Sequence, residues 1–366
     1  MAVRVTRGGV DEALIPDIAG MTAKVCEILD KSAKKTLIDL VKSHLSADGL
    51  INPTVESLLS HIRALRQVAG SDLVRGCKAK DLDELDVEIC KQIAELANQE
   101  LPNKNTAFHK LAVWIGAIQR SYPVEIFTTN YDLLIEQALE ENRVPYFDGF
   151  VGTNKTFFDL QAVEEDRLPE RWARLWKIHG SLNWFENRDK AGSIHRGEVS
   201  GGERRVIYPS HLKYDESRRM PYLAMIDRLR AFLKQPAGTL LVVGYSFNDK
   251  HLNEVITQGL QGNSTAICFG LLFDPLKNYS AAADLAASRS NLNLFASDEA
   301  VIGTKRSQWP TARDAGSCPR DNLAVRWVDD PAKTGTKKAI FSLGDFGSFG
   351  SFLEELIGEK ERNIVC

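Results

Sequence analysis

The sequence predicts an α/β fold, a mostly parallel sheet with helices on both faces. The prediction rests on three stretches, residues 124–138, 175–185 and 239–256. Each begins with a short apolar run that is typical of a buried strand and continues into a polar turn. In the first and third stretches, apolar residues then recur at helical spacing. One such unit is common in α/β proteins, whereas three with this residue content indicate an open sheet that places a ligand at its strand ends.

The first stretch, VEIFTTNYDLLIEQA, contains the turn around which the chain is organised. The apolar run from Val124 to Phe127 predicts a strand, and a helix follows the turn. The free N–H groups at such turns suit phosphate and ribose oxygens. Thr128, Thr129, Asn130 and Asp132 are therefore candidate site residues. The alternative is that Asn130 and Asp132 only cap the helix.

The second stretch, LWKIHGSLNWF, ends its apolar run at His179, Gly180 and Ser181. A histidine at the end of a strand, followed by glycine, can point into the same crevice as Asn130. Most histidines are structural or lie on the surface, so the position of His179 carries this argument rather than its residue type.

The third stretch has a strand at Leu240–Val243 and a turn at Gly244–Asn248, and a helix starts at Asp249. Taken together, TTNYD, KIHGS and VVGYSFND resemble the sirtuin-like NAD-consuming domains of bacterial anti-phage defence, which are related to the protein deacylases called sirtuins. The resemblance extends from about Gly8 to the last helix. It is to the short standalone subunit that assembles with a HerA-type ATPase, and Ser317–Leu323 also resembles a late segment of that subunit.

The resemblance implies a Rossmann-like fold, with NAD as the substrate and a role for each matching residue. Asn130 would hold the ribose or position water, and Asp132 would bind the nicotinamide side or organise the turn. His179 would be the general base. Gly244 and Ser246 would line the adenosine half, and Asp249 would cap its helix. The remaining expected NAD contacts in these motifs are Thr128, Thr129, Gly180 and Ser181.

The family opens with a strand and a glycine-rich GAGxS turn, where missing side chains let the backbone approach the pyrophosphate. Here Val3 and Val5 would be a minimal first strand, Gly8 and Gly9 the remaining turn, and Asp11 stands in place of the serine. A carboxylate beside a pyrophosphate is repulsive. Either the site tolerates this change, or the N-terminus is altered or shortened relative to that of a working enzyme.

Composition restricts the function further. The chain has 366 residues, 43% of them hydrophobic, enough for one large domain or two modest ones. A net charge of −3 argues against a surface that coats nucleic acid, so no direct nucleic-acid binding is predicted. No apolar run approaches the ~20 residues that span a bilayer, and no signal peptide is visible, which predicts a cytoplasmic protein without membrane contact.

Six cysteines occur without any CxxC pair. A zinc ribbon needs such closely spaced pairs, so no metal is expected. Deacylating sirtuins usually carry a four-cysteine zinc module, and its absence favours an enzyme whose only substrate is the dinucleotide.

The predicted organisation is a catalytic domain at residues 1–275, with a helical insertion at about 22–121, and an extension at 276–366 that completes the domain or contacts partners. The insertion is expected mainly to cover the sheet, the alternative being a lid or an oligomer contact. Ala266–Phe273 is expected as the last clear core strand and Asn291–Phe295 as an edge strand.

The function that these observations predict is NAD+ hydrolysis to ADP-ribose and nicotinamide, which would deplete NAD during phage infection. The resemblance further implies a homo-oligomer whose activity depends on assembly with a HerA-type hexameric ATPase. Three alternatives remain at this point: a catalytically silent scaffold that binds nucleotide, an NAD-dependent protein deacylase and, below these, a nuclease.

Overall fold

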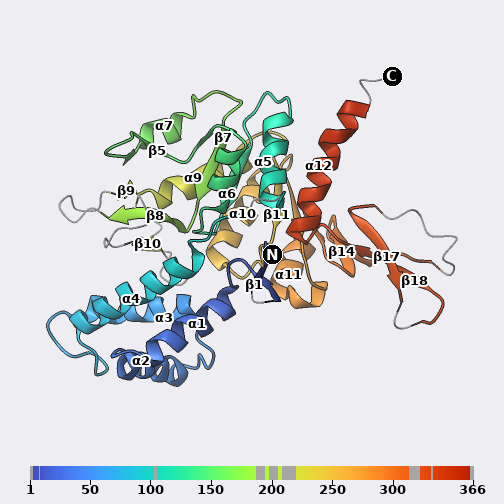
Figure 1. Ribbon diagram of the computed structural model, residues 1–366. Helices are drawn as coiled ribbons and strands as arrows, with labels where there is room; N and C mark the ends of the chain where they lie inside the picture. The colour runs from blue at the N-terminus through green and yellow to red at the C-terminus, as the bar shows by residue number, and fades with distance from the viewer. Residues whose placement is uncertain are drawn as a thin grey trace.

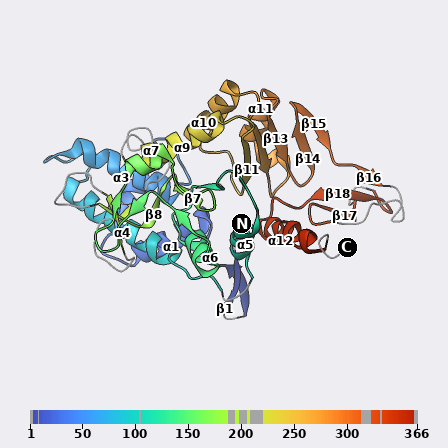
Figure 2. The same cartoon turned by 90° about the horizontal axis from the view of Figure 1, so that it is seen from above.

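The structure is a computed structural model that describes residues 3–7, 9–102, 105–186, 194–197, 205–207, 220–312, 322–330 and 333–362. Figures 1 and 2 show a mixed α/β molecule, with strands in its centre, a group of helices at one end and the C-terminal helix on its surface. None of the described helices combines the length and the apolar character needed to cross a membrane.

The predicted α/β fold with a mostly parallel sheet is confirmed, but the sheet is present in two hydrogen-bonded pieces. The first piece is fully parallel and has the order β3 (Glu125–Thr128), β7 (Ala173–Lys177), β4 (Tyr146–Phe147). The second begins with three parallel strands, β11 (Thr239–Val243), β12 (Ile267–Leu271) and β13 (Leu292–Phe295). It continues antiparallel through β14 (Glu299–Ile302) and β15 (Lys305–Gln308). Among the described strands, β3 pairs only with β7 and β11 only with β12.

Helices cover both faces of the second piece, as the sequence predicts (Figure 2). On one side, α9 (Tyr222–Lys234), α10 (Lys250–Gly262) and α11 (Ser280–Ala287) form one core with the inward side chains of β11, β12 and β13. On the other side lie α5 (Ala107–Ala117) and α12 (Phe346–Arg362), which pack against each other. The helix α6 (Leu134–Glu141) shares a further core with α5 and with residues of β3.

The stretch around Val3 and Val5 does not form a first strand of the parallel sheet, and that expectation is wrong. β1 (Arg4–Arg7) pairs antiparallel with β2 (Val10–Ala13), with Arg7 opposite Val10. Gly9 has φ +82° at the connection, and the positive φ of tight hairpin turns favours glycine. Gly9 is therefore explained by a hairpin rather than by a turn from strand to helix.

The helical insertion is only in part a cover for the sheet. It comprises α1 (Ile18–Asp30), α2 (Lys35–Ala47), α3 (Val55–Ala69), α4 (Ala79–Ala97) and α5. The apolar stripes of α1–α4 face one another and form a separate core, to which no residue of the parallel strands belongs. For α1–α4 the expectation that they cover the sheet is wrong, and Figure 1 shows them as a group below it. Of the five helices, α5 packs against the sheet.

The C-terminal segment is more regular than its sequence indicates. Asn291–Phe295 was expected as an edge strand, which is wrong, because β13 lies between β12 and β14. The pairing of β14 with β15 is made possible by a two-residue turn in which Gly303 and Thr304 have φ +55° and +73°. The loop before α12 also reaches the sheet, since a Cβ on Gly344 would overlap the carbonyl group of Leu272.

Smaller elements surround this centre. β8 (Gly180–Glu186) lies between β9 (Ile194–Arg196) and β10 (Arg205–Ile207) in a separate antiparallel sheet. A second small sheet has the order β16 (Thr311–Ala312), β18 (Lys337–Phe341), β17 (Val325–Asp329). The remaining elements are β5 (Phe150–Val151), β6 (Phe157–Phe158), α7 (Leu160–Glu165) and a 3-10 turn at Leu276–Asn278.

Candidate functional site

The turns after β3 and β7 lie side by side at the carboxyl edge of the first sheet piece. Thr128 and Lys177 are paired at the ends of these parallel strands, and the Ile178 N–H donates to the Thr128 carbonyl oxygen at 2.9 Å. Asn130 and His179 are each two residues beyond this pair. The structure therefore places the two predicted catalytic residues in equivalent positions on adjacent turns.

The TTNYD turn has a buried and an exposed part. Thr128 is buried, and its Oγ1 accepts from the backbone N–H of Asn130 at 3.0 Å. Thr129 is half-buried and Asn130 is exposed. The N-cap of α6 is Leu133, so the capping alternative does not account for Asn130. The exposed Asn130 side chain therefore belongs to a turn whose backbone is fixed by the buried Thr128 side chain.

Asp132 holds the start of α6. Its side chain is buried, and Oδ1 accepts from the Leu134 N–H at 3.1 Å. Of the two roles predicted for Asp132, organising the turn agrees with this contact. The capping alternative thus describes Asp132 in part, because the accepted N–H belongs to the first residue of the helix.

A buried lysine that the sequence analysis did not single out stabilises the same turn. The Nζ of Lys177 donates to the carbonyl oxygen of Asp132 and lies 2.8 Å from Oε1 of Glu136 on α6. Burial raises the pKa of Glu136, and the neighbouring Lys177 opposes that shift. The signal in the sequence was a lysine inside an apolar run, between Trp176 and Ile178.

His179 connects the two pieces of the sheet. Its Nε2 is 3.3 Å from Oδ2 of Asp249, and both side chains are largely buried, with 13% and 11% of their surface exposed. The other carboxylate oxygen of Asp249 accepts from the N–H groups of His251 and Leu252, at 3.1 and 3.2 Å. The predicted helix cap at Asp249 is therefore confirmed, and its contact with His179 is one that the sequence did not reveal.

The turn after β11 contains the third group of candidate site residues. Gly244 and Ser246 are exposed there, and Gly244 has φ +69°. Phe247 is buried with φ +57°, a conformation supported by the Asn253 side chain, whose Nδ2 donates to the Phe247 carbonyl oxygen at 2.7 Å. The side chain of Tyr245 completes this support, since its hydroxyl donates to Oδ1 of Asn253 at 2.8 Å.

Two buried polar atoms on β8 lack partners within the described ranges. Gly180 has φ +87°, and next to it Ser181 is fully buried with no hydrogen bond to its Oγ. The Oδ1 of Asn183, two residues further along the strand, is also buried without a hydrogen-bond partner. Unpaired buried polar atoms are costly and uncommon in native structures. They lie directly after His179 in the chain, and Asn183 was not predicted as a site residue.

The N-terminal candidates lie elsewhere in the fold. Gly9 is exposed at the hairpin turn, while Gly8 and the side chain of Asp11 fall outside what the structure describes. Val3 and Val5 pack into the core that α5 and α6 share. No phosphate-binding turn forms at Gly9, and NAD contacts through Gly8, Gly9 and Asp11 remain untested predictions.

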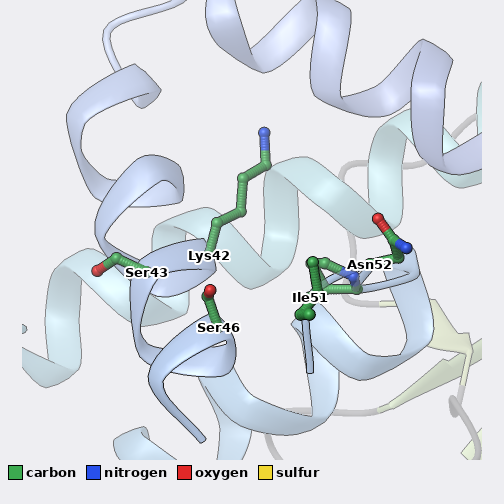
Figure 3. Close-up of a pocket in the computed structure, with 6 residues that line it drawn as sticks. Lys42, Ser43, Ser46, Ile51 and Asn52 are labelled. Carbon is green, nitrogen blue, oxygen red and sulfur yellow. The ribbon is translucent and has the colours of Figure 1, made fainter. Parts of the chain in front are cut away.

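Two other features of the described chain lie apart from this edge. The described residues contain no group of three or more potential metal ligands from histidine, cysteine, aspartate and glutamate. A shallow pocket on α2 and the loop before α3, shown in Figure 3, includes none of the candidate site residues. It is lined by Lys42, Ser43, Ser46, Ile51, Asn52 and Pro53.

The polar groups at the carboxyl edge are of kinds that can bind the oxygen atoms of a nucleotide. An amide side chain on Asn130, the hydroxyl of Ser246 and a histidine stand on turns that follow parallel strands, and the unpaired Oγ of Ser181 is close to them in the chain. Ligands of open α/β sheets bind at this edge. Together the fold and the position of these residues are those of the Rossmann-like class of α/β proteins.

The comparison with known families agrees with this class. Residues 124–290 match the family model of the SIR2-like domain, and that range contains β3, β7, β11 and all three motifs. No curated protein matches the chain. The match supports a relationship of residues 124–290 to sirtuin-like proteins, and it fits an NAD-related activity in general. It does not extend over the N-terminal hairpin or the helical insertion.

Proposed function

We propose that this chain is an NAD+ hydrolase that cleaves the bond between nicotinamide and ribose, with water as the acceptor. The observation that carries the proposal is the placement of Asn130 and His179 on adjacent turns, two residues beyond the paired ends of β3 and β7. Both residues lie within the part of the chain that matches the SIR2-like domain. SIR2-like domains are often NAD-dependent enzymes.

The chemistry requires few groups. Nicotinamide leaves as a neutral molecule from a cationic ring, so positive charge develops on the ribose in an oxocarbenium-like transition state. Asn130 orients the ribose or the attacking water, which lowers the entropic cost of reaching that state. His179 accepts a proton from water or from a ribose hydroxyl. Asp132 keeps the turn in place through its bond to the Leu134 N–H.

We further propose that the other predicted NAD contacts follow the course of the dinucleotide. Thr128 and Thr129, with Gly180 and Ser181, would surround the nicotinamide half. Gly244 and Ser246 would lie toward the adenosine half, and Asp249 would cap the helix that follows them. The exposed positions of Gly244 and Ser246 support this assignment.

The regulatory part of the proposal is that the chain forms a homo-oligomer and assembles with a HerA-type hexameric ATPase in the cytoplasm of a bacterium, where NAD depletion stops phage propagation. Helices α1–α4 support a coupling between assembly and activity. Their core includes Leu182 and is packed against Tyr131, the neighbour of Asn130. A displacement of this helical group would therefore reach the candidate site directly.

We assign residues 1–275 to the catalytic domain and residues 276–366 to an extension that completes it. The pairing of β13 with β12 supports this assignment, since the extension supplies an inner strand of the sheet.

A catalytically silent scaffold is the second candidate, and one observation favours it. The β1–β2 hairpin occupies the stretch in which a phosphate-binding turn was expected. A chain that lacks this turn would bind nucleotide without turnover.

Nicotinamide release from NAD by the purified chain, alone and with its candidate ATPase partner, distinguishes the two functions. If the chain is a hydrolase, it should release nicotinamide, and Asn130→Ala and His179→Ala should each abolish that release. Asn52→Ala, a change to an exposed asparagine on the helical insertion, serves as the control and retains full activity. Bound NAD with no release in any assembly would contradict the hydrolase and support the scaffold.

A further inference from the structure

We propose that Asp249 is the positioning residue of His179, holding the imidazole ring in place and stabilising its protonated form. The inference rests on the proposed hydrolase, whose base it concerns. The two side chains come from different pieces of the sheet, His179 from the end of β7 and Asp249 from the start of α10. Their contact, 3.3 Å between Nε2 and Oδ2, is formed where both are largely removed from water.

Contacts other than the one with His179 fix the carboxylate of Asp249. One oxygen is held by the N–H groups of His251 and Leu252 in the first turn of α10. The Tyr245 hydroxyl shares its one proton between Oδ1 of Asn253, at 2.8 Å, and the backbone carbonyl oxygen of Asp249, at 3.1 Å. The second carboxylate oxygen is thus presented to His179 in a defined direction, as preorganised support for a functional group requires.

The backbone at His179 is fixed as well. The residue before it, Ile178, is buried and donates its N–H to Thr128. The residue after it, Gly180, is buried with φ +87°, a conformation that favours glycine. The chain is thus held on both sides of His179, and the contact with Asp249 helps to orient its ring.

The chemical consequence concerns the proton. In the hydrolysis, His179 takes a proton from water or a ribose hydroxyl as the carbon–nitrogen bond to nicotinamide breaks with both electrons leaving on nicotinamide. The imidazole becomes a cation, which a neighbouring carboxylate stabilises. The proton passes to solvent after the products leave, and Asp249 stays ionised throughout. The products are ADP-ribose, nicotinamide and one proton.

Lys177 and Tyr245, two ionisable groups close to His179 or to Asp249, have their own contacts. Lys177 points toward α6, where it meets Glu136 and the backbone of Asp132. The hydroxyl of Tyr245 keeps its proton, because burial and the nearby carboxylate of Asp249 raise its pKa. On the helix that carries Asp249, Lys250 and His251 are the adjacent groups, and Lys250 is exposed.

The test is Asp249→Asn in the full chain, assembled with whatever partner activates the wild type. Asparagine retains an oxygen for the two helix N–H groups and removes the charge. We expect kcat for nicotinamide release to fall by about 10–100-fold with little change in KM, as loss of a base's partner predicts. Asp159→Asn is the matched control, since Asp159 caps α7 by accepting from the Ala162 N–H at 3.0 Å.

A second readout does not need activity. Titration of the His179 ring by NMR, assigned with His179→Gln, should shift to lower pH in Asp249→Asn because the stabilising charge is gone. An unchanged titration, or an unchanged kcat together with an unchanged pH profile, would overturn the inference while leaving the hydrolase in place. Absence of nicotinamide release in the wild type would instead count against the proposed function, and the NMR titration would still decide the role of Asp249.

Discussion

The buried ion pair between Lys177 and Glu136 allows a quantitative test of how the candidate site is supported. Only 2% of the Lys177 side chain and 10% of the Glu136 side chain are exposed, and the charged atoms are 2.8 Å apart. Lys177 also donates to the Asp132 carbonyl oxygen in the TTNYD turn. Lys177→Met keeps the length of the side chain and removes both interactions.

The expected loss follows from the distance and the burial. At 2.8 Å the attraction is on the order of 6 kcal/mol for an effective dielectric constant of about 20. Desolvation of the two charges offsets part of this value. The remaining Glu136 responds by taking up a proton, since burial already raises its pKa. We therefore expect Lys177→Met to lower the free energy of unfolding by about 3–5 kcal/mol.

Urea unfolding followed by tryptophan fluorescence measures this loss, in a cycle with Glu136→Leu and the double variant. The double variant should lose less than the sum of the two single losses, because no unpaired charge remains buried. Lys31→Met is the control, since the ion pair of Lys31 with Glu27 is mostly exposed and its removal should leave the unfolding midpoint in place. Strictly additive losses would refute the coupling. In the active assembly, Lys177→Met should also reduce nicotinamide release, because it frees the Asp132 turn.

Two further measurements address the rest of the fold. Gly344→Ala should lower the free energy of unfolding by about 3 kcal/mol, because the added Cβ would overlap the carbonyl group of Leu272. The control is Gly358→Ala in α12, which has open space around it and should be neutral or stabilising. Equal effects of the two substitutions would contradict the close approach at Gly344. Burial lowers the pKa of His44 and His61 in the helical insertion, so the unfolded chain binds protons that the folded chain does not. The free energy of unfolding should then fall as the pH drops below about 6.5, by up to about 1.4 kcal/mol per histidine for each pH unit. The melting temperatures at about pH 7.5 and about pH 5.5 should therefore differ less for the double variant His44→Gln/His61→Gln than for the wild type. An equal pH dependence of the two proteins would exclude these histidines as its source.

Much of the parallel sheet and the main part of the candidate site could be predicted from the sequence. The strands at Val124–Phe127 and Leu240–Val243 are encoded by local apolar runs, and the polar turns follow them directly in the chain. Asn130 and His179 could be placed on one edge because adjacent parallel strands end at the same side of a sheet. This inference needs the direction of the strands but no contact between distant side chains.

The contacts that complete the site were decided by the tertiary structure. Asp249 could be recognised as a helix cap, because that interaction is local, whereas its pairing with His179 depends on how the two pieces of the sheet are arranged. The same holds for Lys177 and Glu136, which meet only because α6 packs beside β7. Residue spacing cannot reveal which charged groups become neighbours after packing.

Strand partners were the other property that the sequence left open. The residues of β1 suit a strand in a parallel sheet as well as one in a hairpin, and the alternation of β13 suits an edge as well as the interior. Backbone hydrogen bonding carries no side-chain identity, so partner choice depends on which strands are brought within reach. The sequence by itself determined the strands, their turns and the residue types at the carboxyl edge. Only the tertiary structure decided the pairing of the strands and the partner of the histidine, since both arise from contacts between segments far apart in the chain.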